Sequence, residues 1–391
     1  MEAPPRHRDG LRVHAGNFQC SPHPPHITRG RGGSGKPRTA PGTLVGWDSD
    51  PEIFATGTAV PPASEPSTPE TVPSAARDAC PACGEAEFRT LFRGTDRLFG
   101  TTDEDFLIVE CRQCRLIRLF PWPPPEKLRQ YYPPDYWFDP AASAADSLAE
   151  MWRRLVIRDH VQFVRKALAA VPPDSLVLDV GCGGGLFLRE LHLPEHRAFG
   201  LDFSLDAASV AWSTNGVPVV CGALPRAPFR PGSFGLITMF HVLEHLYDPA
   251  AYLAAARELL APEGRLVVQV PNAGCWQFLL FGANWNGLDV PRHLIHFRES
   301  DLEALLDSAG FEIVRRKHFS LRDNPAGLAS TLAPRLDPMG RRVRAADGSP
   351  RKKLVKDAAY FLLVLASIPF AALEAACRAG STIMAEARLK P

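Results

Sequence analysis

The stretch VLDVGCGGGLF, residues 177–187, constrains the fold of this 391-residue chain more than any other. It begins as an apolar strand that ends in an acid, continues with Gly181, Gly183 and Gly185, and leads into apolar residues that can start a helix. A strand, a glycine-rich turn and a helix in this order are typical of a parallel α/β sheet that binds a nucleotide-like ligand at its carboxyl edge.

The residues around this loop favour a ligand that has a ribose and a positive charge but no phosphate. A P-loop needs Gly-Lys-Ser/Thr after the glycines, and a dinucleotide loop needs GxGxxG; Leu186 and Phe187 fit neither. Asp179 would repel a pyrophosphate but attract an ammonium or sulfonium, and Asp202 can accept hydrogen bonds from a ribose. S-adenosylmethionine has these features. A tight structural turn in a NAD-type fold is the alternative.

The pattern after residue 170 predicts a seven-stranded, Rossmann-like α/β sheet. Five apolar stretches with helical segments between them are the expected parallel strands: residues 176–180, 197–202, 217–222, 234–240 and 264–270. A helix over residues 299–311, a sixth strand over 312–320 and a last strand over 381–389 complete the expected order.

Five segments in order resemble the class I S-adenosylmethionine-dependent methyltransferases: VLDVGCGGGLF, AFGLDFS, GSFGLITMFHVLEHL, PEGRLVVQVPN and PRHLIHF. The resemblance covers about residues 150–320 and implies that the sixth and seventh strands form an antiparallel hairpin. It also implies that Asp179 and the three glycines surround the methionine part of the cofactor, and that Asp202 binds the ribose. The expected cofactor site is completed by Phe203, Ala223, Leu224 and Phe240.

The chain departs from this family after the third expected strand. Many members carry Gly-Asp-Ala where this chain has Gly222, Ala223 and Leu224. The acid that usually contacts the adenine amino group is therefore missing, and we expect backbone groups or a neighbouring residue to replace it and cofactor affinity to be lower.

Four of the nine cysteines form the pattern CxxC-x27-CxxC, which predicts a tetrahedral zinc site: Cys80, Cys83, Cys111 and Cys114. This block resembles the zinc ribbon that precedes many bacterial sugar, lipid and antibiotic methyltransferases. We expect zinc to have a structural role, folding a module too small to build its own core. A substrate-facing lid and a redox pair are the alternatives.

The expected organisation has four parts. Residues 1–75 are rich in Pro, Gly, Ser and Arg and are predicted to be a disordered tail. The zinc-ribbon module is expected over residues 76–122, a helical connector over 123–170, and the methyltransferase domain over 171–391. Residues 321–379 are expected to be a helical insertion before the last strand.

The candidate catalytic residues are His241, Glu244, His245 and His293. The spacing of the first three places them on one helix face at the carboxyl edge of the sheet. His245 or His293 could act as a general base for a hydroxyl nucleophile. Related O-methyltransferases carry Glu-x-x-Glu-His, so His241 weakens the case for Mg²⁺, although a softer ion could use these side chains. The third possibility is that Glu244 and His245 only brace the structure beside the cofactor.

The insertion combines a basic run with an apolar one. Seven Arg and Lys residues between 341 and 356 precede the uncharged stretch 358–373, which contains Pro369. This stretch is too short for a membrane span, and a single crossing would separate the last two strands. We therefore expect peripheral membrane contact through residues 341–373, at the inner, cytoplasmic face. A buried helix and a dimer contact are the alternatives.

The expected function is O-methylation of a small or lipid-linked acceptor, such as a sugar, a polyketide or a quinone-like hydroxyl. An RNA methyltransferase and a non-enzymatic membrane adaptor are the alternatives. The net charge of +1 and the lack of a basic face on the cysteine block make nucleic acid an unlikely partner. No apolar segment follows Met1, so a cytoplasmic location is expected, with the oligomeric state left open.

Overall fold

The predicted sheet is present in the computed structural model, which describes residues 79–132, 144–194, 197–346 and 348–391. Its strand order is β10-β11-β8-β7-β4-β5-β6. The strands are β4 (Leu176–Val180), β5 (Ala198–Asp202), β6 (Val219–Cys221), β7 (Phe234–Phe240), β8 (Leu260–Pro271), β10 (Phe311–Lys317) and β11 (Thr382–Leu389). The tail predicted over residues 1–75 lies outside the described residues.

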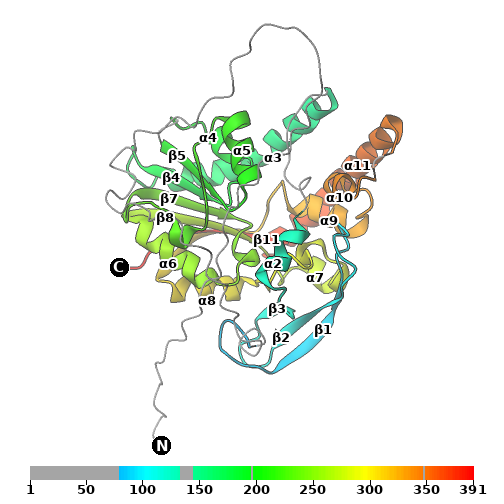
Figure 1. Cartoon of the computed structure of the whole chain (residues 1–391), viewed down its shortest axis with the longest axis horizontal. Helices are drawn as coiled ribbons and strands as arrows, with labels where there is room; N and C mark the ends of the chain where they lie inside the picture. The colour runs from blue at the N-terminus through cyan, green and yellow to red at the C-terminus, as the bar shows by residue number, and fades with distance from the viewer. Residues whose placement is uncertain (1–78, 133–143, 195–196, 347) are drawn as a thin grey trace, which may run out of the picture.

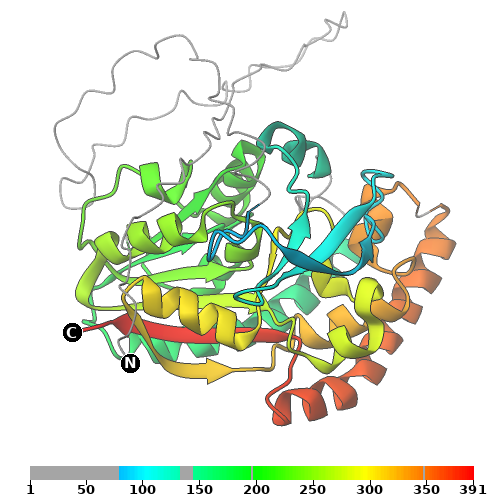
Figure 2. The ribbon, with the colours of Figure 1, turned by 90° about the horizontal axis from the view of Figure 1, so that it is seen from below.

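Strand direction confirms the predicted topology. Strands β4 to β8 are parallel, whereas β11 runs antiparallel to both β8 and β10. The hairpin of the last two strands is therefore confirmed, and Figure 2 shows β10 and β11 side by side at the edge of the sheet.

Alternate residues of the central strands build two apolar cores, one on each face of the sheet. Val177 and Leu236 pack in the core that contains residues of α3 (Ala144–Leu168), α4 (Leu186–Leu191) and α5 (Leu205–Asn215). Leu178 and Ile237 pack in the core that contains residues of α6 (Pro249–Leu259) and α8 (Glu299–Ser308). Helices thus cover both faces (Figure 1), and ligands bind such sheets at the carboxyl edge.

The cysteine block folds as a four-stranded sheet whose fourth strand comes from far along the chain. Strands β1 (Phe88–Gly94), β2 (Phe106–Cys111) and β3 (Ile117–Phe120) are followed by α2 (Pro125–Leu128) and the 3-10 turn η1 (Arg129–Tyr131). The two-residue strand β9 (Ile295–His296) pairs with β3 and completes this sheet. The sequence analysis did not predict this connection, which joins the block to the larger sheet's domain.

Three helices separate β10 from β11, as expected for the insertion. They are α9 (Asn324–Leu332), α10 (Pro338–Val343) and α11 (Pro350–Ala376), and Pro369 lies inside α11. Between β8 and β9 the chain forms α7 (Trp276–Phe281) and the 3-10 turns η6 (Gly282–Asn284) and η7 (Asn286–Leu288). In Figure 1, α11 projects away from the sheet beside α9 and α10.

Candidate active site

The glycine loop after β4 has the backbone conformation that its sequence requires. Gly181, Gly183 and Gly185 have φ values of 72°, 52° and 75°, which other residues rarely adopt. A Cβ atom on Gly181 would lie 2.7 Å from Cγ2 of Val242. The alternate glycines therefore allow both the turn and its close approach to the segment after β7.

Two buried carboxylates flank this loop. Asp179 accepts a hydrogen bond from Thr238 Oγ1 (2.5 Å), and Asp202 accepts from the backbone N–H groups of Gly183 and Ser204 (both 2.9 Å). Burial and the negative charge of Asp202 raise the pKa of Asp179 to about 7. Burial also raises the pKa of Asp202. A cationic ligand beside this pair would favour the charged form of both acids.

The residues that are predicted to contact the adenine of the cofactor follow β6. Ala223 precedes the 3-10 turn η4 (Leu224–Arg226), Leu224 is buried, and the Phe203 side chain is 43% exposed. The N–H of Gly222 donates to the backbone carbonyl of Asp202 (2.9 Å). Because alanine has no polar side-chain atom, Ala223 can offer a ligand only its backbone polar groups.

Phe240 connects the loop to the histidines. Its ring lies 5.0 Å from that of Phe187 on α4 and 5.1 Å from that of His160 on α3, between centroids. The next residue along the chain is His241, so the catalytic candidates begin beside the cofactor loop.

The expectation that His241 and His245 share a helix face is wrong. His241 has a φ of 54°, and residues Leu243–His245 form one 3-10 turn, η5. The chain reverses too tightly there for an α-helix, and the two histidines reach different partners. Glu244, with 1% of its side chain exposed, lies between them.

His241 belongs to a polar network that includes a residue of the insertion. Its Nδ1 lies 3.1 Å from Glu244 Oε1, and its Nε2 lies 3.6 Å from Asp323 Oδ2. Asp323 also accepts hydrogen bonds from Gln269 Nε2 (2.7 Å) and Ser320 Oγ (2.6 Å). Burial opposes the charged imidazolium, but Asp323 and Glu244 outweigh it and raise the pKa of His241 to about 9. His241 is therefore a cation at neutral pH and a poor resting base.

His245 and His293 form the other half of the cluster, with ring centroids 4.6 Å apart. His245 Nδ1 lies 3.1 Å from the carbonyl of Arg292, and His293 Nδ1 lies 2.9 Å from the carbonyl of Gly287. Because a carbonyl can only accept, both Nδ1 atoms carry a proton, and in the neutral form of each ring the lone pair is on Nε2. Burial and the nearby His293 lower the pKa of His245 to about 4, so it is neutral at pH 7.

These groups fit a transition-metal ion. Glu244, His245 and His293 offer ligand atoms within 4.8 Å of one another. Among the described residues, nothing donates a hydrogen bond to the buried Oε2 of Glu244. Two imidazole nitrogens and one carboxylate oxygen suit ions such as Mn²⁺, Fe²⁺ or Zn²⁺ better than Mg²⁺. His241 lies outside this set because it faces the other oxygen, Oε1.

Tyr132 joins the cofactor side to the histidines. Its hydroxyl lies 2.9 Å from His245 Nδ1, and its ring lies 6.1 Å from that of Phe203, the residue after Asp202. The sequence analysis assigned no role to Tyr132. Tyr132 therefore connects His245 to Phe203, which lies at the end of β5, the strand that is predicted to bind the ribose.

Three further residues of the site were not predicted from the sequence: His160, Gln269 and Asp323. His160 is fully buried on α3 and lies 3.5 Å from Asp323, which precedes α9. No motif marks them, because each comes from a different element. One of the three could have been noticed in the sequence: Gln269 lies in an apolar strand, and a polar side chain buried there needs a hydrogen-bond partner.

The four predicted metal-binding cysteines converge. The Sγ atoms of Cys80 and Cys114 are 3.5 Å apart, as are those of Cys83 and Cys111, and all four lie within 4.8 Å of one another. Four thiolates at about 2.3 Å from one zinc ion would be about 3.8 Å apart, so the cluster fits zinc.

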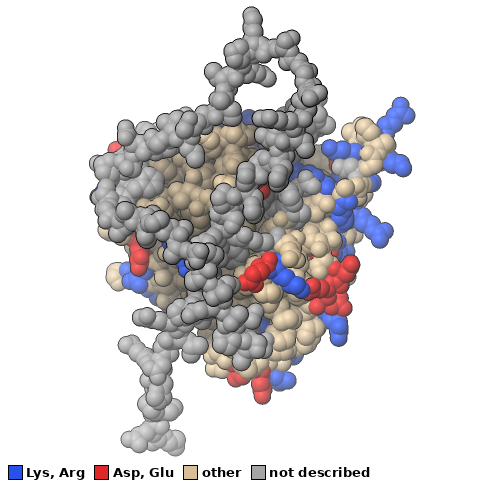
Figure 3. Space-filling view, viewed as in Figure 1, with Lys and Arg blue, Asp and Glu red and all other residues tan. Residues whose placement is uncertain are grey.

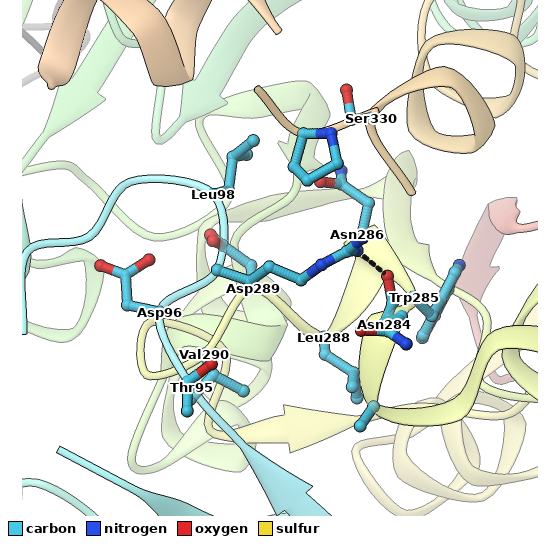
Figure 4. A pocket seen from close by; sticks show the side chains of 13 residues that line it. Thr95, Asp96, Leu98, Asn284, Trp285, Asn286, Leu288, Asp289, Val290 and Ser330 are labelled. Carbon is cyan, nitrogen blue, oxygen red and sulfur yellow. Dashed lines mark hydrogen bonds between the residues drawn. The ribbon is translucent and has the colours of Figure 1, made fainter. Parts of the chain in front are cut away.

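A small cavity, shown in Figure 4, marks the junction between the cysteine block and the site. Asp96 and Asp289 line this cavity, and both accept hydrogen bonds from Nη2 of the fully buried Arg292, each at 2.8 Å. Arg97, which also lines it, donates to the carbonyl of Asn284. The cysteine block thus supports the segment that carries His293, the next residue after Arg292.

Comparison with known proteins agrees with this geometry. A family model described as a methyltransferase domain matches residues 149–316. This match supports the resemblance of residues 149–316 to class I S-adenosylmethionine-dependent methyltransferases. The antiparallel hairpin, the glycine loop and the paired acids of the structure agree with what that resemblance implied.

Two curated relatives show how far the likeness extends. A probable S-adenosylmethionine-dependent methyltransferase of Mycolicibacterium smegmatis is 33% identical, over 40% of this chain and 58% of the relative. A ubiquinone biosynthesis O-methyltransferase of Xanthomonas euvesicatoria is 32% identical, over 35% of this chain and 62% of the relative. The chain thus spans less than two thirds of the length of these relatives.

A solved S-adenosylmethionine-dependent methyltransferase of Thermotoga maritima aligns at 24% identity with a TM-score of 0.34, over 44% of this chain and 78% of that one.

Proposed function

We propose that this protein transfers the methyl group of S-adenosylmethionine to an oxygen atom of a small or lipid-linked acceptor. The observation that carries the proposal is the cluster of Glu244, His245 and His293 at the carboxyl edge, joined through Tyr132 to Phe203. The sulfonium donor is already activated, so the chain mainly has to position the acceptor and help it lose a proton. The similarity to ubiquinone O-methyltransferases supports oxygen as the acceptor.

The protonation states of His241 and His245 limit which side chain can remove a proton from the acceptor. His241 already holds a proton, because its pKa is raised to about 9. A histidine whose pKa is lowered to about 4, such as His245, takes a proton from a hydroxyl poorly. A metal-free general base at His241 or His245 is therefore the weaker of the two catalytic interpretations.

We propose instead that Glu244, His245 and His293 hold a divalent cation. A cation held there would lower the pKa of an acceptor hydroxyl, which is what an oxygen nucleophile needs. The buried, unpartnered Oε2 of Glu244 and the two Nε2 lone pairs support this assignment. A second ion, zinc, would be held by Cys80, Cys83, Cys111 and Cys114 in a structural role.

Cofactor binding is tested first. Asp202→Ala should weaken binding of S-adenosylmethionine at least about 100-fold in calorimetry, since hydrogen bonds to a charged group contribute about 1.5–3 kcal/mol each. Asp174→Ala, an exposed acid before β4 at the opposite edge, is the matched control and should bind like wild type. Unchanged binding by Asp202→Ala would overturn the ribose assignment.

The cation site is tested by metal content and turnover in the same samples. Wild type should carry two metal ions per chain, and Glu244→Gln should carry one and lose at least about tenfold in methyl transfer to hydroxylated acceptors. Glu258→Gln, an exposed carboxylate on α6, should keep both ions. If Glu244→Gln retains its metal and its rate, the cation proposal is wrong and the methyl-transfer proposal still stands.

A further inference from the structure

Helix α11 turns its large apolar side chains toward solvent. Six of them are 40–69% exposed although the helix packs against the protein: Leu354 (69%), Val355 (68%), Phe361 (42%), Leu362 (65%), Leu365 (40%) and Leu373 (58%). Their positions recur at the spacing of one helix face. A surface helix of a soluble protein normally shows the reverse pattern, with its leucines inward.

Three polar side chains of the same helix, Asp357, Tyr360 and Glu374, face the protein and fix its orientation. Tyr360 Oη lies 2.9 Å from Ser330 Oγ of α9. Glu374 accepts hydrogen bonds from the backbone N–H of Gln277 (2.9 Å) and from its Nε2 (2.8 Å) on α7. Asp357 forms an ion pair with the buried Arg341. The apolar face is therefore held outward by specific contacts on the opposite face.

Neighbouring elements extend this apolar face. Leu279 and Leu280 of α7 are 77% and 65% exposed, and Leu332 of α9 is 51% exposed. A groove between these helices is lined by Leu280, Phe281, Leu328, Leu332, Leu363 and Phe370. Leucines of three elements thus form one apolar surface, larger than the scattered leucines found on most soluble proteins.

Basic side chains border the apolar surface. Arg351, Lys352 and Lys353 at the start of α11 are exposed, and none of them forms an ion pair among the described residues. The first turn of α11 contains no acid. Figure 3 shows Lys and Arg side chains gathered over the outer end of α11, at the upper right of the molecule. A partner for this surface must therefore present apolar groups and negative charge together.

The topology decides how such a partner would meet the helix. Within the described residues, α11 alone has the length and composition to cross a membrane, and only 22% of its most apolar window is buried. Its far end leads into β11, which is hydrogen-bonded between β8 and β10. If α11 crossed a membrane, it would draw β11 away from the sheet. A membrane could therefore contact α11 only along the side of the helix.

We propose that the exposed face of α11, with Leu279, Leu280 and Leu332, binds the surface of an anionic lipid bilayer. The leucines enter the boundary between headgroups and acyl chains, and Arg351, Lys352 and Lys353 contact lipid phosphates. This inference does not depend on the proposed chemistry, because none of these side chains belongs to the active site.

Vesicle flotation of the full-length protein tests the proposal. Wild type should float with vesicles of phosphatidylcholine containing about one-third phosphatidylglycerol, and several-fold less with phosphatidylcholine alone. The triple variant Leu354→Ser, Leu362→Ser and Leu365→Ser should lower the floated fraction at least about tenfold. Lys352→Ser with Lys353→Ser should remove the preference for phosphatidylglycerol.

Matched controls separate this surface from general stickiness. Val314→Ser removes an apolar side chain of β10 that is 45% exposed, and Lys166→Ser with Arg230→Ser removes two exposed charges elsewhere. Both should float like wild type, and every variant should bind S-adenosylmethionine as wild type does. The proposal is overturned if wild type stays unbound or the triple variant floats equally well. It also fails if light scattering shows a dimer that the triple variant makes monomeric, with no flotation of either protein.

Discussion

Asp179 is the residue whose protonation we expect to report cofactor binding. Its pKa is raised to about 7 in the free protein, mainly by burial. A bound cation would favour the carboxylate and lower that pKa, so binding releases a proton. Affinity for S-adenosylmethionine should therefore rise with pH up to about 7, by at most about tenfold per pH unit, and level off above it.

Calorimetry from about pH 5.5 to about pH 8.5, in buffers of different ionisation enthalpy, checks this coupling. Asp179→Asn should bind more weakly and without the slope, because an amide does not titrate in this range. A flat affinity profile in wild type would contradict the assignment of Asp179 to the cationic part of the ligand.

His241 should make stability depend on pH in the opposite direction. Its pKa is about 9 in the folded protein, against about 6.5 in an unfolded chain. Its ion pairs with Asp323 and Glu244 therefore contribute fully below about pH 6.5, and the contribution is lost as pH rises through 9. The loss should be on the order of 1–3 kcal/mol.

Urea unfolding at about pH 6.5 and about pH 9.5 measures this loss, and Asp323→Asn should reduce it. Histidine Cε1 resonances followed by NMR give the titration of His241 directly. A midpoint near that of a free histidine would show that Asp323 does not hold the imidazolium in solution.

At the scale of elements, β9 and the residues before it join the two sheets. Arg292 lies there, with its guanidinium 4.4 Å from the Phe99 ring and hydrogen-bonded to Asp96 and Asp289. Arg292→Leu would leave the buried carboxylate of Asp96 and the partly buried one of Asp289 without their arginine partner. We expect a loss of about 3–5 kcal/mol in the free energy of unfolding.

Urea unfolding checks this prediction, with Arg388→Leu as the control. Arg388 pairs with Glu312 on the surface, where both side chains are about half exposed, so its loss should cost less than about 1 kcal/mol. If Arg292→Leu does not fold, Arg292→Lys can be measured instead. It should lose less stability because it keeps the charge, and the remaining loss should reflect the bidentate contacts that lysine cannot make. Equal effects at both positions would contradict the role given to the buried cation.

The sequence predicted strands well where an apolar run is bounded by turn residues. The strands β4, β5, β7 and β8 are apolar runs with turn residues between them, and each is present in the predicted order. The turn η5 was mistaken for a helix because the spacing of His241 and His245 also fits one, and the positive φ of His241 has no sequence signature. A two-residue strand such as β9 is too short to produce a pattern.

The site was predictable only in part, for a related reason. Gly181, Asp179 and Asp202 lie in local motifs whose chemistry can be inferred from neighbouring residues. Asp323 of the insertion contacts His241, and His160 of α3 contacts Asp323, so only tertiary packing brings these residues together. Sequence spacing holds no information about such contacts.

At the scale of the whole molecule, removal of zinc should destabilise more than the cysteine block. Cys80 and Cys111 belong to the same hydrophobic core as Leu178 and Ile237 of the large sheet. We therefore expect a strong zinc chelator to lower the midpoint of a single, cooperative thermal transition and to weaken S-adenosylmethionine binding with it. Circular dichroism and tryptophan fluorescence should report the same midpoint.

Two separate transitions, with only the first sensitive to chelation, would show that the cysteine block folds independently. Cys114→Ser, which removes one thiolate, should reproduce the effect of the chelator in the absence of any chelating agent. A wild-type melting curve that does not respond to zinc removal would contradict the structural role of the ion.

The pairing of β9 with β3 also limits which segments of this protein can be exchanged with those of relatives. Three strands of the small sheet come from residues 88–120, but the fourth, Ile295–His296, is encoded far downstream. A chimera that exchanges only the N-terminal segment would expose the edge of β3 and break the contacts of Arg292 with Asp96. Recombination between relatives should therefore succeed only when the two segments are inherited as a pair, although more than 170 positions separate them.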